Sequence, residues 1–234
     1  RATRMLGSVK PPSERLTVVL DPWVCAQFLG IVGGTLSGEM VLKGRSLFAD
    51  RLGEDVAAPG VTLIDDPTDP AAFTATATDG EGLATRRNVL VNSGRLDQFV
   101  HNSWTARRCG TSSTGSAVRG YSTTPGVGVQ AVSLLPGRDD PADLIAAIDD
   151  GVLLQSVTGL HSGVNPVSGD FSTGAEGLRI RNGELAEPLR EFTVGSTIQR
   201  MLLDVTGIGN DLEWQPMSAA GVTLVIGELT VSGA

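Results

Sequence analysis

The chain has 234 residues, of which 41% are hydrophobic, so it is long enough to bury a sizeable core in one large domain or two small ones. Its formal net charge is −8 and its only lysines are Lys10 and Lys43, so we expect no basic face that neutralises phosphates and no binding to nucleic acid. No apolar run approaches the roughly 20 residues that a membrane-spanning helix needs, and we expect no membrane contact.

The glycine content indicates the fold class, and the cysteine spacing indicates the redox compartment. With 30 glycines and 4% aromatic residues, the short apolar runs favour a fold rich in strands and turns over a helical bundle. Cys25 and Cys109 lie far apart without a Cys-x-x-Cys motif, which favours two buried free thiols in a reducing cytoplasm. The sequence begins with Arg1 and not Met, so we expect an upstream domain, with residues 1–15 as a helix end and a linker from it.

Local signals place the secondary-structure elements along the chain. We expect strands at residues 16–20, 61–65, 73–78, 86–92, 129–135, 152–158, 176–181, 185–193 and 222–232, and helices at residues 22–31, 36–42, 97–109, 141–149 and 195–204. Asp21-Pro22 is a helix start, Gly33-Gly34 should end or kink the first helix, and Asn182-Gly183 predicts a hairpin turn. Residues 110–128, rich in Ser, Thr and Gly, should form an extended loop.

These elements predict the α+β class. We expect a strand-rich, curved or barrel-like sheet, antiparallel or mixed, with a few packed helices. The helices at 22–31 and 195–204 should pack on the sheet.

Residue types that carry common chemistries are scattered along the chain. His101 and His161 are the only histidines, and neither has a second metal ligand at helical spacing. The glycine-spaced segment 169–174 has no lysine to meet a phosphate, so it is not a P-loop. Paired aspartates such as Asp149-Asp150 lie at the ends of predicted elements, where capping explains them better than acid–base catalysis. These patterns indicate no catalytic residue.

Four longer segments appear in the order of a known family and span almost the whole chain. They are 19–22 with the stretch from 36 to 68, 94–96 with 105–106 and 113–117, 163–172, and 207–212 with 229–233. Together they resemble the TldD/PmbA family. Residues 16–234 resemble the carboxy-terminal domain of its PmbA (TldE) type of subunit.

The resemblance also bears on catalysis. The TldD type of subunit resembles a zinc peptidase, with a His-Glu-x-x-x-His helix and a cysteine near the carboxy terminus as the third ligand. The matching positions here hold Leu29, Gly30 and Gly34, and no cysteine follows Asn210. None of these residues can bind zinc or move a proton. The resemblance therefore implies no catalytic residue, metal or cofactor in this chain, and zinc only in a TldD-type partner.

For the function, the resemblance implies a non-catalytic partner subunit of a heteromeric TldD/PmbA-type zinc peptidase that acts on unfolded or modified peptides. The alternative is a stand-alone peptide-binding or scaffold protein of the same family without peptidase activity. A homodimer of the isolated chain stays open. The family's older label, modulator of DNA gyrase, does not imply contact with DNA, given the acidic balance of the sequence.

Residues 161–172 are the candidate segment for peptide contact. The candidate residues are His161, Gly163, Asn165, Gly169, Asp170 and Ser172. Glycines let another backbone approach closely, and a peptide added to a sheet edge gains main-chain hydrogen bonds with little sequence preference. The alternative interpretation is structural, with two turns at Asn165-Pro166 and Gly169-Asp170.

Overall fold

The computed structural model describes residues 2–233, which divide into two compact units. The barrel unit contains the residues up to Cys25, Pro136–Glu213 and the residues from Gly221 onward. The second unit contains Ala26–Leu135 and Trp214–Ala220. Within residues 2–233, no helix is long and apolar enough to cross a membrane.

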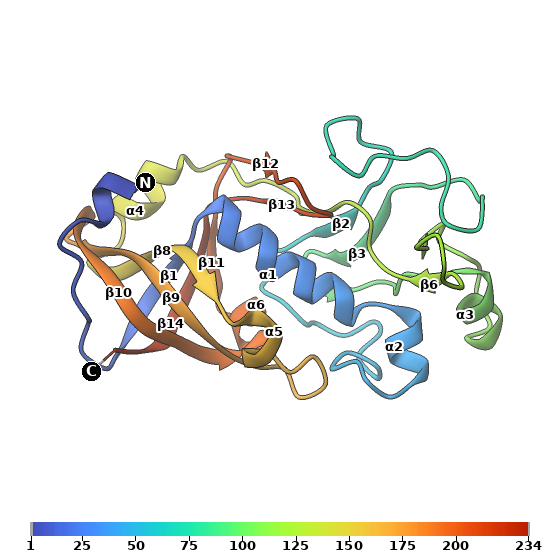
Figure 1. The fold of residues 1–234 in the computed structure, drawn as a ribbon, viewed down its shortest axis with the longest axis horizontal. Coiled ribbons are helices and arrows are strands. Elements are labelled where there is room, and N and C mark those ends of the chain that lie inside the picture. The colour runs from blue at the N-terminus through green and yellow to red at the C-terminus, as the bar shows by residue number, and fades with distance from the viewer. Residues whose placement is uncertain (1, 234) are drawn as a thin grey trace. The chain divides into compact units, whose positions relative to one another are not determined.

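A closed sheet of five strands forms the barrel unit (Figure 1). In ring order the strands are β1 (Glu14–Leu20), β8 (Asp150–Thr158), β9 (Asp170–Arg181), β10 (Glu184–Thr197) and β14 (Leu224–Ser232). The ring closes because β14 pairs with both β10 and β1. β1 and β8 are parallel, and the other pairs in the ring are antiparallel. The predicted α+β class with a curved, barrel-like mixed sheet is confirmed.

The sequence of β1 explains its position in the sheet. Leu16, Val18 and Leu20 alternate on one face and are at most 3% exposed. Val19 points to the opposite face and is buried in a second cluster. That cluster also contains Ile148, Leu153, Ile180 and Val225, with Leu144 and Ile145 packed against it. Because both faces of β1 are buried, a slip by one residue would repack both clusters, which fixes the strand register.

The β9–β10 hairpin turns at Asn182 and Gly183, as predicted. Their φ angles of 49° and 79° fit a type I′ turn, whose twist matches that of the flanking strands. The hairpin is longer than predicted, reaching back to Asp170 and on to Thr197. β10 accommodates Pro188, which lacks an N–H donor, next to a shift in register.

Shorter elements complete the barrel unit. They are η1 (Ala2–Met5), α4 (Pro141–Ala146), α5 (Leu160–Gly163), α6 (Ile198–Leu203) and β11 (Val205–Ile208), which pairs with β14. The predicted start of α4 is confirmed, since Asp140 Oδ1 accepts a hydrogen bond from the Ala142 N–H at 2.8 Å. Within the predicted linker, Val9 forms a bridge with Leu189 of β10.

The second unit contains an antiparallel sheet of four short strands. In spatial order they are β4 (Arg95–Leu96), β3 (Asn88–Asn92), β2 (Leu63–Asp65) and β7 (Val132–Leu134). Other elements of the chain are α2 (Gly38–Leu42), α3 (Ser103–Arg108), β5 (Ala117–Val118), β6 (Gly126–Val127), β12 (Glu213–Trp214) and β13 (Ala220–Gly221). Helix α1 (Pro22–Thr35) begins in the barrel unit, where Asp21 Oδ1 caps it by accepting from the Val24 N–H at 2.9 Å.

The prediction that the first helix ends near Ile31 is wrong. α1 continues through Gly33 and Gly34 to Thr35. A Cβ at Gly33 would lie 2.6 Å from Val129 Cγ2, so the glycine there allows close packing within the second unit. We expected Gly33 to end or kink the helix, whereas its role is to leave room for the Val129 side chain.

Two further predictions fail because side chains bond the local backbone. No strand forms at residues 73–78, where Asp69 Oδ1 accepts from the Ala71 N–H and Thr76 Oγ1 donates to the Thr78 carbonyl. The helix expected at residues 97–109 is only α3. Asn102 accepts from the Thr105 N–H at 2.9 Å and so sets its start.

Candidate functional site

The α1 positions that the resemblance assigns to zinc chemistry carry no donor atoms in their side chains. Leu29 is fully buried. Gly30 is partly exposed and Gly34 is exposed, and apart from their chain neighbours and the backbone of α1 itself, no described atom lies within 4 Å of the point where a Cβ of either would stand. Space for larger side chains exists at both glycines, but the residues present do not fit a zinc ion.

The remaining metal-ligating residue types do not supply a site either. Among residues 2–233, no three His, Cys, Asp or Glu side chains lie close enough to hold a metal ion together. Burial raises the pKa of the Cys25 thiol to about 12, so it stays protonated at neutral pH and is a poor ligand. The prediction of two buried thiols is half wrong, because Cys109, just after α3, is exposed.

The two glycines of the candidate peptide segment are required by its own packing. A Cβ at Gly163 would lie 1.9 Å from the Ser172 carbonyl oxygen. Gly169 has φ +85°, and a Cβ there would lie 2.0 Å from Gln199 Oε1. The structure thus brings Gly163 and Ser172 together and uses both glycines for close approach within the chain.

The polar residues of this segment form a local turn. Asn165 Oδ1 accepts from the Val167 N–H at 2.9 Å, and the Asn165 N–H donates to the Asp170 carbonyl at 2.9 Å. Ser168 Oγ donates to Asp170 Oδ2 at 2.6 Å. Val164 also bridges Phe171, so the first residues of β9 already have a neighbour from the same chain. His161 is exposed in α5, which leaves its side chain accessible to a ligand.

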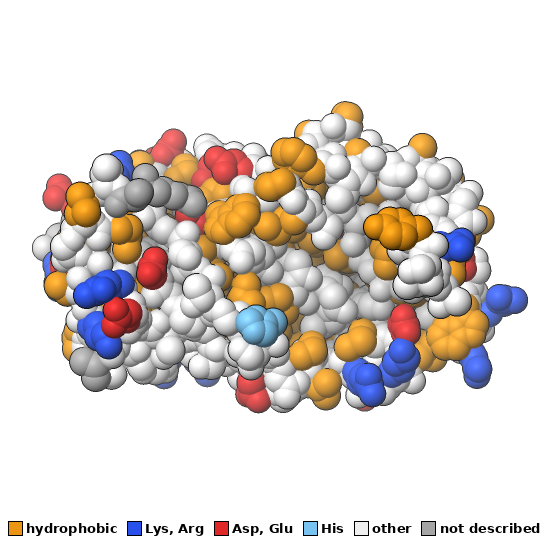
Figure 2. Space-filling view, in the orientation of Figure 1, with side chains coloured by type: hydrophobic (Ala, Val, Ile, Leu, Met, Phe, Trp, Pro, Cys, Tyr) orange, Lys and Arg blue, Asp and Glu red, His pale blue; other side chains and the backbone are white. Residues whose placement is uncertain are grey.

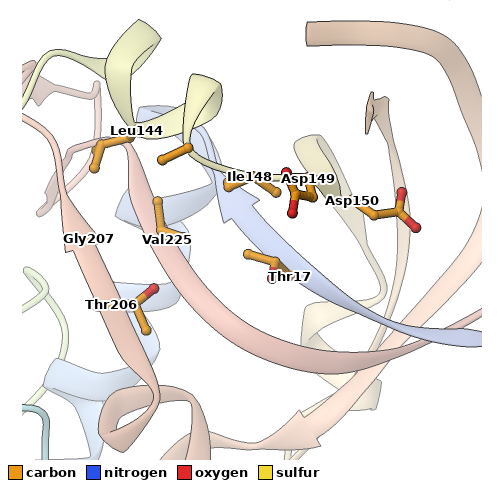
Figure 3. Close-up of a pocket in the computed structure, with 9 residues that line it drawn as sticks. Thr17, Leu144, Ile148, Asp149, Asp150, Thr206, Gly207 and Val225 are labelled. Carbon is orange, nitrogen blue, oxygen red and sulfur yellow. The ribbon is translucent and has the colours of Figure 1, made fainter. Parts of the chain in front are cut away.

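A groove of about 500 Å³ runs between α4 and the barrel wall (Figure 3). Leu144 and Ile148 form one side, Val225 of β14 lies on the wall, and Asp149 and Asp150 lie at one end. The Asp150 carboxylate already accepts from Arg179 Nη2 at 2.5 Å. The groove can hold an apolar group beside Leu144, Ile148 and Val225.

A second cavity, of about 470 Å³, lies wholly within the second unit. Arg86, Asp97, His101 and Cys109 are among its lining residues. Sequence reasoning considered His101 only as a metal ligand and missed this site. His101 precedes the N-cap of α3, Thr105 lies in the helix and Cys109 is its C-cap, so one short helix and its two ends bring these residues near one another.

The fold of this chain recurs in proteins of known structure. Over 99% of this chain, the structure is similar to a candidate modulator of a DNA gyrase from Thermotoga maritima, with a TM-score of 0.93 and 29% sequence identity. It is also similar to TldE from Thermococcus kodakarensis, with a TM-score of 0.90 and 26% identity over 99% of this chain. These likenesses define the fold as one that this chain shares with TldE and with the gyrase-modulator structure.

Sequence comparisons establish the family. A metalloprotease of Methanothermobacter thermautotrophicus is 33% identical over 213 residues, which are 90% of this chain. The family model of the PmbA/TldA metallopeptidase C-terminal domain matches residues 13–233, and the chain belongs to this family. The match covers 46% of the archaeal metalloprotease and 53% of each solved chain, so this chain spans about half the length of the relatives it matches.

Proposed function

We propose that this chain belongs to a non-catalytic partner subunit of a heteromeric TldD/PmbA-type zinc peptidase acting on unfolded or modified peptides. The observation that carries the proposal is the composition of α1. Leu29 is buried in the core, and Gly30 and Gly34 have no side chain that could bind zinc or accept a proton from water.

Zinc and the general base belong, in this proposal, to a TldD-type subunit. A solved relative named TldE and a relative named metalloprotease, both matched over most of this chain, support a family with more than one kind of subunit. The role of this chain is then to stabilise the assembly and to present surface to the peptide. Its two free cysteines, Cys25 and Cys109, fit a reducing cytoplasm.

Co-expression with a TldD-type subunit tests the proposal. The two proteins should co-purify, and the complex should hydrolyse an unfolded peptide until a chelator is added. The chain alone should leave the same peptide intact. Chelator-resistant hydrolysis by the isolated chain would contradict the proposal, and peptide binding without any retained TldD-type subunit would favour a stand-alone scaffold.

A further inference from the structure

The 470 Å³ cavity of the second unit has the make-up of a ligand site. Its lining combines the polar or charged side chains of Arg86, Asp97, His101 and Cys109 with apolar ones that include Leu52 and Phe99. Small-ligand sites typically measure about 300–1,000 Å³ and set a few convergent polar groups in an apolar wall. The chain brings these groups together from segments before β3, after β4 and on both sides of α3.

His101 is only 6% exposed, and its neighbours hold its side chain in one orientation. Its ring Nδ1 lies 3.2 Å from Thr105 Oγ1, and its backbone N–H donates to Thr114 Oγ1 at 2.7 Å. Gly38 packs directly against the ring, since a Cβ there would lie 2.3 Å from Nδ1. Contacts from α2, α3 and the 113–117 turn thus immobilise this side chain, as a specific binding site requires.

The same neighbours set the tautomer of the ring. Thr105 Oγ1 lies 3.0 Å from Asn102 Oδ1, closer than to His101 Nδ1, so the hydroxyl proton points to the amide oxygen. Nδ1 of His101 then donates to Thr105, and Nε2 keeps a lone pair. Nε2 has no hydrogen-bond partner among residues 2–233. Burial lowers the pKa of His101, so the ring is neutral at pH 7. Nε2 can therefore accept a hydrogen bond from a ligand.

Arg86 and Asp97 add one positive and one negative charge to the wall. Within the described chain, the Arg86 guanidinium donates to a single acceptor, the Ser113 carbonyl, which leaves N–H donors for a ligand. The Asp97 carboxylate has no side-chain partner among residues 2–233. A guanidinium pairs well with a carboxylate, and a carboxylate pairs well with an ammonium group.

We propose that this cavity binds a short apolar peptide by its two free ends. Arg86 pairs with the carboxy-terminal carboxylate, Asp97 and His101 Nε2 accept the N–H groups of the terminal ammonium, and the apolar wall contacts the side chains. A zwitterion satisfies both wall charges at once, whereas a simple anion or cation leaves one unpaired. Binding here needs no partner subunit, so it stands or falls independently of the proposed peptidase role.

The chain itself supplies two readouts of occupancy. Cys109 is exposed on the cavity wall, whereas Cys25 is buried with a raised pKa, so iodoacetamide should modify Cys109 selectively. Saturating Leu-Leu dipeptide should slow that alkylation by about tenfold or more. It should also shift the imidazole NMR signals of His101 and leave those of exposed His161, in the barrel unit, in place.

Blocked dipeptides and a matched pair of variants test the assignment of the ends. N-acetyl-Leu-Leu and Leu-Leu-amide each lack one charge and should bind about tenfold more weakly than Leu-Leu. Arg86→Gln should abolish the preference for a free carboxylate. Arg87→Gln should retain it, because the Arg87 guanidinium lies 3.8 Å from Asp66 and does not line the cavity.

Three results would overturn the proposal. They are an unchanged rate of Cys109 alkylation in saturating Leu-Leu, equal affinity for free and blocked dipeptides, and an unaltered preference in Arg86→Gln.

Discussion

The barrel unit and the second unit satisfy their buried backbone groups by different means. Strands of seven to fourteen residues make up the barrel ring, and inter-strand pairing accounts for most of their backbone. In the second unit the sheet strands have only two to five residues, and buried side chains form hydrogen bonds with the backbone instead. Asp65 Oδ1 accepts the Gln130 and Ala131 N–H groups at 2.8 and 2.7 Å. The barrel should therefore be sensitive to backbone crowding, and the second unit to the loss of polar side chains.

The two units also differ in net charge. The barrel unit has nine basic and sixteen acidic residues, for a net charge of −7, whereas the second unit has nine and ten, for −1. On the face shown in Figure 2, basic side chains gather over α2 and α3. The exposed basic residues there are Lys43, Arg45, Arg107 and Arg108. A charged partner would therefore distinguish the two units by electrostatic attraction.

Crowding the barrel backbone should have the largest effect. A Cβ at Gly177 of β9 would lie 2.0 Å from the Leu153 carbonyl oxygen of the neighbouring strand. Gly177→Ala should lower the free energy of unfolding by about 3 kcal/mol or more, measured by urea denaturation. Gly195→Ala in β10 is the control, because nothing lies within 4 Å of its Cβ position, and it should change stability by less than about 1 kcal/mol. Equal losses in the two variants would refute a steric cause.

Asp65 should make the stability of the second unit depend on pH. Burial raises the pKa of Asp65 from 3.8 to about 6 in the folded chain, and its Oδ2 has no partner in the described residues. Because the folded state holds this proton more tightly, the stabilisation is complete below pH 3.8 and is lost as the pH rises through about 6.

Asp65→Asn should remove that pH dependence. The difference in unfolding free energy between the original chain and the variant should change by about 3 kcal/mol between acidic and neutral pH. Urea denaturation at a series of pH values measures it. The unfolding free energy of Asp50→Asn, a substitution at an exposed position, should depend on pH in the same way as that of the original chain. Parallel curves for Asp65→Asn too would show that Asp65 does not titrate with a raised pKa.

A buried arginine gives the third prediction, again in the barrel. Arg179 is 4% exposed and donates to Glu14 Oε1 and Asp150 Oδ2, each at 2.5 Å. Arg179→Met should lower the unfolding free energy by about 1–2 kcal/mol, because two partly exposed carboxylates lose their counter-charge. Arg181→Met breaks only an exposed pair with Glu187 and should leave the melting temperature unchanged. A larger loss for Arg181→Met would contradict the role given to burial.

The smallest expected effect concerns the proposed peptide segment. His161→Ala should raise the KM of partner-supported hydrolysis about twofold to threefold while leaving stability unchanged, if this exposed ring contacts the peptide. Asn165→Ala is a less selective probe, because Asn165 Oδ1 holds the local turn and its loss also destabilises the segment. An unaltered KM in His161→Ala would assign residues 161–172 a structural role alone.

Local sequence signals predicted those parts of the structure that local chemistry determines. Asn182-Gly183 defines its hairpin because few residues adopt two successive positive φ angles. Asp140-Pro141 starts α4 because the Asp140 side chain caps the helix and the fixed φ of proline fits its first turn. Gly33 was misjudged because its role depends on Val129, almost a hundred residues away. The cavity beside His101 escaped prediction because its walls come from four separate segments. Long-range packing, and not propensity, decides such features.

Metal analysis of the purified chain tests the central claim most directly. With Leu29, Gly30 and Gly34 on α1, we expect far less than one zinc ion per chain after dialysis. In a complex with a TldD-type subunit, the zinc should stay with that subunit when the two are separated. Elemental analysis that finds about one tightly held zinc per isolated chain would contradict it.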